Sequence, residues 1–324
     1  MLRKTLILTL LFALAITGCA PASTPTETPA PVATEISATE APIATSGLTF
    51  TDGLGREVKL DGPAQHIISL APSNTEILFA IGAGDQMVGR DAYSDYPAEV
   101  SAVTDIGDTY SDLDTELIVS LKPDLILAAE INTQEQVKAL EDLGLTVYYL
   151  KNPTTLEGMY QNLEIVAQLT GHEADAAALT DSLKSRVAVI DNALAPISAR
   201  PSVFYEIDGT DPAKPYTAGK GTFITLLIER AGGTNIAADI DGYPQLSLEQ
   251  VVAADPSFII LGDSAFGVTA ELVSTRPGWE NLSAVKSKQI LPFDDNLLSR
   301  PGPRMVDGLE ALVAILHPSL IPAP

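Results

Sequence analysis

One phrase occurs twice in this chain of 324 residues. Residues 113–127 are LDTELIVSLKPDLIL, and residues 246–260 are LSLEQVVAADPSFII. In each copy a helix-capping residue precedes a glutamate, an apolar helical stretch follows, and a proline leads into an apolar run that is typical of a strand. Because such a repeat describes one helix-to-strand unit, it predicts a chain built from two similar halves.

Strand and helix patterns alternate on both sides of a helical middle. A hairpin signal over residues 48–60 comes first. The strand-like runs are HIISL, DLILAA and LTVYYL in the first half and SVFYEI, SFIIL and KQILPF in the second. This alternation predicts largely parallel sheets with helices on both faces, which is an α/β fold. The first helix, in APSNTEILFAIGAG, is expected to begin with a capping box made by Ser73 and Glu76.

Between the halves, residues 155–194 show helical spacing and no strand signal. Gly171 separates two helices, and the second is more than 20 residues long, so we expect a rigid strut between two lobes. The predicted organisation is a signal peptide over 1–18, a tether over 19–46, an N-terminal lobe over 47–152, a helical segment with the strut over 153–199, and a C-terminal lobe over 200–320.

The amino terminus has the composition of an export signal. MLRK is positively charged, residues 6–16 are apolar but too few to span a bilayer, and ITGC ends the segment with small residues. This resembles the lipobox of bacterial lipoproteins and implies that Cys19, the single cysteine, carries lipid. A buried structural thiol is the alternative. Residues 20–46 are rich in alanine, threonine and proline, which predicts a solvated tether rather than a folded stalk.

The charge of the chain excludes some partners, and its motifs exclude some activities. The net charge is −23, and removing the first 18 residues with their two basic side chains leaves −25. Nucleic acid and anionic membrane surfaces are therefore poor partners. TAGKGTF lacks the glycine and the hydroxyl residue of a P-loop, and His66, His172 and His317 lack metal-ligand spacing. No GxSxG elbow or acid/base spacing is present, so we expect no enzyme.

The two glutamates of the repeated phrase are candidate contact residues. At 100° per residue, the apolar residues of each helix lie opposite Glu116 in the first copy and Glu249 in the second. Both carboxylates are expected to face solvent. Each could simply complement a helix macrodipole, which is worth about 0.3–1 kcal/mol at a surface. That alternative explains either residue more easily than it explains matched positions in both halves.

Taken together, these features resemble the class III substrate-binding proteins of bacterial ABC importers for iron chelates and vitamin B12. The resemblance extends from about Leu48 to His317. The motifs nearest to the vitamin B12-binding members are LAPSNTEILFA, YSDYP, LKPDL, PYTAGKGTFI, AGGTNI and YPQLSLEQV. The resemblance implies two Rossmann-like lobes with central, largely parallel sheets, joined by a single long helix. It also implies a monomer with no intrinsic cofactor that works with a permease dimer and its ATPase.

The resemblance also assigns roles to individual residues. Glu116 and Glu249 match the carboxylates that dock into arginine pockets of the permease. The aromatic residues that wall the ligand cleft correspond to four tyrosines, namely Tyr93, Tyr110, Tyr216 and Tyr243. Tyr110 and Tyr243 replace tryptophans of the vitamin B12-binding members, so the smaller rings leave room for a different ligand, and phenols can also coordinate iron. An ordinary loop tyrosine is the alternative at each position.

Two arginines lie before the last helix, in NLLSRPGPRM. A cation in the first turn of a helix opposes the macrodipole, so Arg304 is expected to pair with Asp294 or Asp295, or with an anionic group of the ligand. An internal salt bridge is the expectation in so acidic a protein. The cleft arginines of siderophore binders, which pair with anionic chelates, keep a ferric ligand open for Arg300 and Arg304.

We therefore expect an extracytoplasmic receptor, anchored to a bacterial membrane through Cys19, that captures a small metal chelate and hands it to an ABC permease. A corrinoid such as cobalamin is placed ahead of a ferric siderophore, and haem third. A sensory lipoprotein with the same fold and no permease is a further alternative. It predicts that Glu116 and Glu249 are dispensable.

Overall fold

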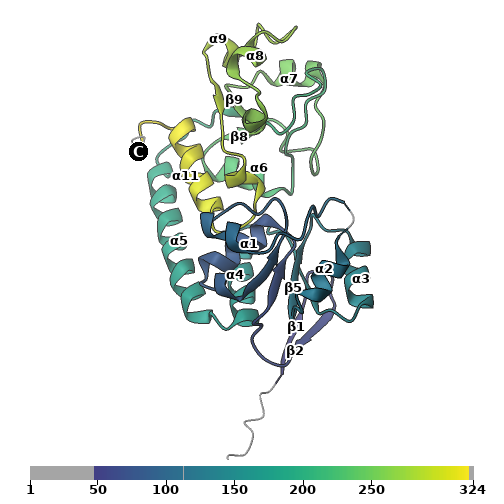
Figure 1. Cartoon of the computed structure of the whole chain (residues 1–324). Coiled ribbons are helices and arrows are strands. Elements are labelled where there is room, and N and C mark those ends of the chain that lie inside the picture. Colours follow the sequence, from purple (N-terminus) through teal and green to yellow (C-terminus); the bar gives the residue numbers. More distant parts are fainter. Residues whose placement is uncertain (1–46, 112, 321–324) are drawn as a thin grey trace, which may run out of the picture. The chain divides into compact units, whose positions relative to one another are not determined.

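Two four-stranded sheets form the framework of the described residues (Figure 1). The computed structural model describes residues 47–111 and 113–320, which all belong to the unit Thr45–Pro324. An antiparallel hairpin of β1 (Leu48–Thr51) and β2 (Glu57–Leu60) precedes both sheets, as predicted.

The first sheet is parallel throughout. Its strands are β3 (Ile67–Ser69), β4 (Met87–Arg90), β5 (Leu125–Ala129) and β6 (Val147–Leu150). They lie in the order β4-β3-β5-β6. Every residue of β5 is buried, which is typical of a parallel strand that is covered on both faces.

The second sheet repeats the topology of the first. Its strands are β7 (Ser202–Glu206), β8 (Thr234–Asn235), β9 (Phe258–Leu261) and β10 (Ile290–Pro292). They are parallel and lie in the order β10-β9-β7-β8. When the strands of each sheet are counted along the chain, both sheets have the order second, first, third, fourth. The prediction of two similar halves in an α/β fold is confirmed.

The repeated phrase occupies the same place in both sheets. Helix α2 (Thr115–Ser120) leads into β5, and helix α7 (Leu248–Ala254) leads into β9, the third strand of its sheet. The side chain of Asp114 accepts a hydrogen bond from the backbone N–H of Leu117, and that of Ser247 accepts one from Gln250, so both predicted caps are confirmed.

The backbone that follows these two helices is also matched. Lys122 has a φ of 51° and Asp255 a φ of 40°, and each stands directly before the proline of its phrase. A residue before proline is sterically restricted from the right-handed helical region, which explains why both helices stop there. The repeat therefore extends from side-chain pattern to backbone conformation.

Alternate residues of each strand bury themselves in different apolar clusters. Ile67 and Leu125 face one cluster, whereas Ile68 and Ile126 face another, because successive side chains of a strand point to opposite faces. The cluster that contains Ile67 and Leu125 also holds buried residues of β7 and β9 from the second sheet. One apolar core is therefore shared by both halves.

Long helices accompany this shared core. Helix α4 (Leu156–Thr170) ends at Gly171, which takes a left-handed φ of 80°, and α5 (Glu173–Leu194) follows as the predicted 22-residue strut. Helix α5 packs against α4 and against α11 (Met305–Leu316), the last helix (Figure 1). In the chain α5 joins the first sheet to the second, as expected.

Helix α1 (Pro72–Ala80) lies in the segment where the first helix was predicted, and α3 (Gln134–Asp142) and α6 (Phe223–Arg230) continue the alternation of strands and helices. The capping box expected at Ser73 and Glu76 is wrong. Helix α1 begins two residues earlier than that box requires, with Pro72 at its first position and Ala71 as a cap without a side-chain bond. The released Glu76 carboxylate is buried and bonds elsewhere.

Several short elements were not predicted. They are β4, β8, the helices α8 (Ala270–Ser274), α9 (Ser283–Lys286) and α10 (Asn296–Ser299), and three 3-10 turns. Each has too few residues to show a hydrophobic period.

Candidate ligand-binding site

The candidate site is built from loops that follow the carboxyl ends of the parallel strands. Tyr93 follows β4, Tyr216 follows β7, and Tyr243 follows β8. Phe266 ends a turn after β9, and Asp295 follows β10. In open α/β sheets, ligands bind beyond the carboxyl ends of the strands, so both sheets direct side chains to the expected edge.

Two of the predicted tyrosines line one cavity. Tyr93 and Tyr110 pack edge to face with their ring centroids 5.3 Å apart. They belong to a cavity of about 400 Å³, here called the Tyr93 cavity. Residues of both halves of the chain line it, among them Ser73, Ala129, Asn152, Phe266, Asp295, Ser299 and Arg300.

The other two tyrosines line a neighbouring cavity of about 340 Å³, here called the Tyr216 cavity. Tyr216 and Tyr243 stand there with an apolar surface from Ile207, Phe223 and Ile224. Asp295 and Ser299 line both cavities, so the two adjoin. All four tyrosines are between 43% and 68% exposed, which leaves their rings available to a bound molecule.

The shared edge of the two cavities is acidic. Burial raises the pKa of Asp295, and the buried Tyr205 hydroxyl donates a hydrogen bond to its carboxylate. Burial, followed by the negative charges of Glu130 and Asp295, raises the pKa of Tyr243 to about 12. Tyr243 is therefore a neutral phenol that can donate a hydrogen bond at neutral pH.

One cationic side chain, that of Arg300, lines these two cavities within the described part of the chain. Its Nη1 lies 3.0 Å from Glu76 Oε1 and 2.5 Å from Asp95 Oδ1, and its Nη2 donates to the Tyr93 carbonyl at 3.3 Å. The charge of Arg300 is therefore already paired inside the protein.

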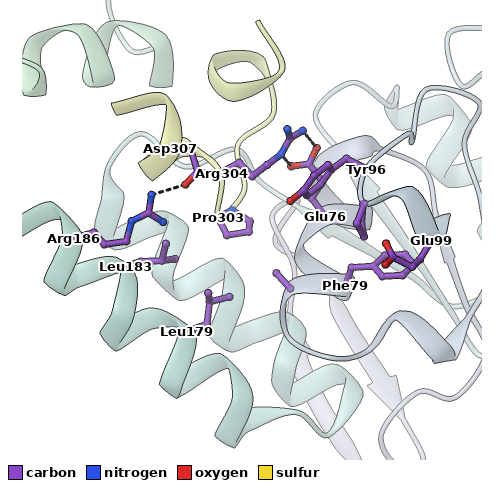
Figure 2. A pocket seen from close by; sticks show the side chains of 12 residues that line it. Glu76, Phe79, Tyr96, Glu99, Leu179, Leu183, Arg186, Pro303, Arg304 and Asp307 are labelled. Carbon is purple, nitrogen blue, oxygen red and sulfur yellow. Dashed lines mark hydrogen bonds and ion pairs between the residues drawn. The ribbon is translucent and has the colours of Figure 1, made fainter. Parts of the chain in front are cut away.

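Arg304 lies in a different cavity, of about 530 Å³, here called the Arg304 cavity (Figure 2). The expected pairing with Asp294 or Asp295 is wrong. Instead, Arg304 forms a two-pronged salt bridge with Glu76, with Nε 2.8 Å from Oε2, and stacks over the ring of Tyr96 at 4.0 Å. A partner 228 positions away in the chain is beyond what local spacing can indicate.

Glu116 and Glu249 are exposed on α2 and α7, as predicted. The structure adds one matched feature, because Val119 and Val252 stand three residues after each glutamate and are 45% and 43% exposed. Residues three apart lie on the same side of a helix. Each half thus presents a carboxylate next to an apolar side chain.

Phe266, Ser299 and Glu130 were not predicted, and Asp295 was predicted only as a partner of Arg304. Phe266 is 89% exposed, and it borders the Tyr93 cavity. The signal that could have found these residues is positional, since all four follow strands of the two sheets. Each of the three histidines contacts a different part of the chain. Among the described residues, no group of three or more potential metal ligands exists.

The paired parallel sheets, with cavities where their strands end, define the class III fold of substrate-binding proteins. The chain belongs to the periplasmic binding protein family, whose sequence profile matches residues 67–297. Members of this family are binding proteins that act outside the cytoplasm. The resemblance drawn from the sequence motifs is confirmed.

Three similar proteins show the breadth of the family. The uncharacterized ABC transporter substrate-binding lipoprotein YvrC of Bacillus subtilis (strain 168) is 35% identical over 276 residues, 84% of this chain and 86% of that protein. The periplasmic vitamin B12-binding protein BtuF of Vibrio cholerae has a TM-score of 0.67 at 30% identity, covering 78% of this chain and 97% of that one. The apo haem-binding protein RhuT from Roseiflexus sp. RS-1 has a TM-score of 0.70 at 28% identity, covering 80% and 100%.

Cys19, the signal peptide and the tether lie outside the described residues. Among the helices that are described, none combines the length and the apolar character needed to cross a bilayer.

Proposed function

We propose that this protein is the extracytoplasmic receptor of an ABC importer and that it binds a corrinoid in the adjoining Tyr93 and Tyr216 cavities. The observation that carries the proposal is the convergence of four exposed tyrosines, from loops of both sheets, on two cavities that share Asp295 and Ser299. Tyrosine rings can pack on a planar macrocycle while their hydroxyls reach its amide groups.

The charge of the cavities supports a corrinoid over haem. Asp208 and Asp295 are acidic, and Arg300 already bonds to two carboxylates. The propionates of haem and the negative charge of a ferric catecholate would find no unpaired cation in this site. An unpaired buried charge is costly, so both ligands are disfavoured. A corrinoid presents neutral amides, which the phenol of Tyr243 can bind.

A ferric hydroxamate is the second candidate. The same acidic edge accepts a neutral or cationic chelate, and four phenols offer oxygen atoms to a hard metal ion. The pKa of Tyr243, about 12, disfavours this route at that residue, because coordination requires the phenolate.

The proposal is tested by calorimetric titration of residues 47–324 with cyanocobalamin, a ferric trihydroxamate, a ferric catecholate and haem in parallel. We expect tight binding of cyanocobalamin and no binding of haem or the catecholate. Tight haem binding with no response to cyanocobalamin would refute the corrinoid assignment. Direct contact between Arg304 and the ligand remains a prediction of the resemblance, although its guanidinium is paired with Glu76 outside both tyrosine cavities.

For the partner, we propose a permease built from two similar subunits, which Glu116 and Glu249 contact. Matched glutamates, matched exposed valines and matched caps support this role, because a single-helix capping function does not require an apolar companion. A salt bridge at the rim of such an interface sets orientation, and the adjoining valine loses its hydrated surface.

The remaining parts of the proposal concern organisation and membrane attachment. The lobes are assigned to 47–152 and 200–320, with the helical segment between them, and one complete parallel sheet falls in each lobe. A lipid on Cys19 would hold the receptor at the membrane. Replacing Cys19 with alanine should release the protein from the membrane fraction, and unchanged membrane retention would count against the anchor.

A further inference from the structure

A cluster of four charged side chains links residues that are more than 200 positions apart in the chain. It is here called the Glu76 cluster and consists of Glu76, Asp95, Arg300 and Arg304. Glu76, on α1, accepts hydrogen bonds from both arginines, which flank the segment between α10 and α11. Asp95 binds Arg300 as well.

Residues of the cluster line two cavities. Arg300 lines the Tyr93 cavity, whereas Glu76 and Arg304 line the Arg304 cavity. Figure 2 shows the Glu76–Arg304 pair at one wall of the Arg304 cavity, beside Tyr96. Because the Glu76 carboxylate bonds to both arginines, a displacement of the Glu76–Arg304 pair also displaces Arg300 at the Tyr93 cavity.

The cluster also holds the loop that carries a candidate ligand residue. Arg300 donates to the backbone carbonyl of Tyr93, Asp95 is bound two residues later, and Tyr96 is stacked under Arg304 at 4.0 Å. On its other side the loop is tied by Asp91, which accepts from the Tyr93 N–H at 3.1 Å. The backbone of Tyr93 is thus fixed from two directions.

Three of the four side chains in the cluster are largely buried. The side chains of Glu76, Arg300 and Arg304 are 1%, 12% and 13% exposed. Removal of Glu76 leaves the largely buried Arg304 guanidinium without its carboxylate partner, which is costly and therefore favours the paired geometry. General stability alone is a weak reason for such a cluster, because apolar residues of equal volume often serve as well.

We propose that the Glu76 cluster is a positioning device for the ligand site. It sets the placement of the Tyr93 ring relative to the segment 295–300 of the second half, and its central residue, Glu76, lines neither tyrosine cavity. This proposal rests on the ligand site proposed above. It assigns to Glu76 an effect on affinity that acts through Tyr93.

The test compares Glu76→Gln with Arg186→Gln. Arg186, on α5, forms a more exposed ion triad with Asp307 and Glu310 of α11 and contacts neither Tyr93 nor Tyr96. Two quantities are measured: the Kd for cyanocobalamin by calorimetry, and hydrogen exchange at the amides of residues 92–96 in the ligand-free protein. We expect Glu76→Gln to weaken binding about tenfold and to speed exchange in this loop, and Arg186→Gln to do neither.

A double-mutant cycle separates positioning from general weakening. If Glu76 acts through Tyr93, its effect on Kd shrinks when Tyr93→Ala is already present, whereas independent effects add. Asp95→Asn, at an exposed residue, keeps the test open if Glu76→Gln fails to fold, and it should change both quantities in the same direction by less.

The outcomes are distinct. Unchanged exchange in Glu76→Gln or Asp95→Asn, an additive cycle, or equal changes in Arg186→Gln would overturn the proposal. If the wild-type protein does not bind cyanocobalamin, the corrinoid assignment fails, while the exchange measurement still decides whether the cluster holds the loop.

Discussion

The two halves of this protein share a scaffold and differ in the side chains they direct to the candidate ligand site. Both sheets have the same strand order, and both have the same capped helix with an exposed glutamate and valine before the third strand. At the carboxyl ends of the strands, Tyr93 and Tyr110 pack on each other, whereas Tyr216 and Tyr243 border an apolar surface. In the function proposed above, the repeated surface contacts a permease of two similar subunits, and the diverged loops contact an asymmetric ligand.

The interiors of the halves differ as well. Around β3 and β4, hydroxyl groups form a buried chain in which Thr75 bonds to Ser69 and Ser94, and Ser94 donates to Asp91. In the second half, Glu206 and Arg276 form a fully buried ion pair, and Arg276 lies 4.8 Å over Trp279. These two buried polar groups differ in kind, because the first is built from hydroxyl groups and ends on Asp91, whereas the second joins two charged side chains.

The largest expected effect concerns the repeated surface. Replacing both Glu116 and Glu249 with alanine should abolish transporter-stimulated ATP hydrolysis and leave the ligand Kd unchanged, because both carboxylates lie outside the cavities. Glu135→Ala is the matched control, since Glu135 is an exposed acid in the first turn of α3. Normal coupling by the double variant would show that the repeat has no docking role.

The next effect distinguishes the interiors. Arg276→Ala should lower the free energy of unfolding by about 3–5 kcal/mol, because it leaves the buried Glu206 carboxyl group without its cationic partner. Ser94→Ala, in the first half, should cost about 1 kcal/mol. Urea unfolding measures both, and the pair Glu206→Gln with Arg276→Met should recover most of the first loss. Equal losses for Arg276→Ala and Ser94→Ala would remove the contrast between the halves.

A smaller effect, on ligand affinity, tests whether both halves contact the ligand. Tyr93→Ala and Tyr243→Ala should each weaken cyanocobalamin binding about tenfold through lost ring contact, and the phenylalanine variants should lose less. Calorimetry provides the measurement. If only one of the two alanine variants binds more weakly, the ligand occupies one cavity and not both.

The smallest effect is a pH dependence at Tyr243. The pKa of Tyr243 is about 12 in the folded protein, against an ordinary value of 10. Between these two pH values the folded protein keeps the phenol proton, whereas the unfolded chain releases it. The stabilising contribution of the phenol is complete below pH 10 and is lost as the pH rises through 12. Ultraviolet difference titration against Tyr243→Phe measures this, and Glu130→Gln should lower the pKa. A titration midpoint near pH 10 for Tyr243 would contradict the claim that burial and nearby acidic groups raise its pKa.

Much of the fold followed from local patterns. The caps at Asp114 and Ser247, the break at Gly171 and the long α5 were all predicted, because capping and periodicity involve residues within a few positions of one another. Strands β4 and β8 escaped prediction, since their pairing depends on neighbours from distant parts of the chain.

The candidate site was predictable in part. The motifs identified four tyrosines, and the structure brings them to two adjoining cavities. Glu76 shows the limit of local inference, because its spacing from Ser73 predicts a capping box, yet the folded protein uses its carboxylate to hold Arg300 and Arg304. A tertiary ion pair that excludes water is stronger than a cap exposed at a helix end.

By itself, the sequence determined the repeated helix-to-strand unit, the alternation of strands and helices along the chain, and the exposure of Glu116 and Glu249. These depend on the period of apolar residues and on contacts within one helical turn. The tertiary structure alone decided which charges pair and which tyrosines share a cavity. The Glu76–Arg304 pair joins residues 228 positions apart, and the tyrosine cavities are lined by loops that follow different strands, so no local pattern predicts these contacts.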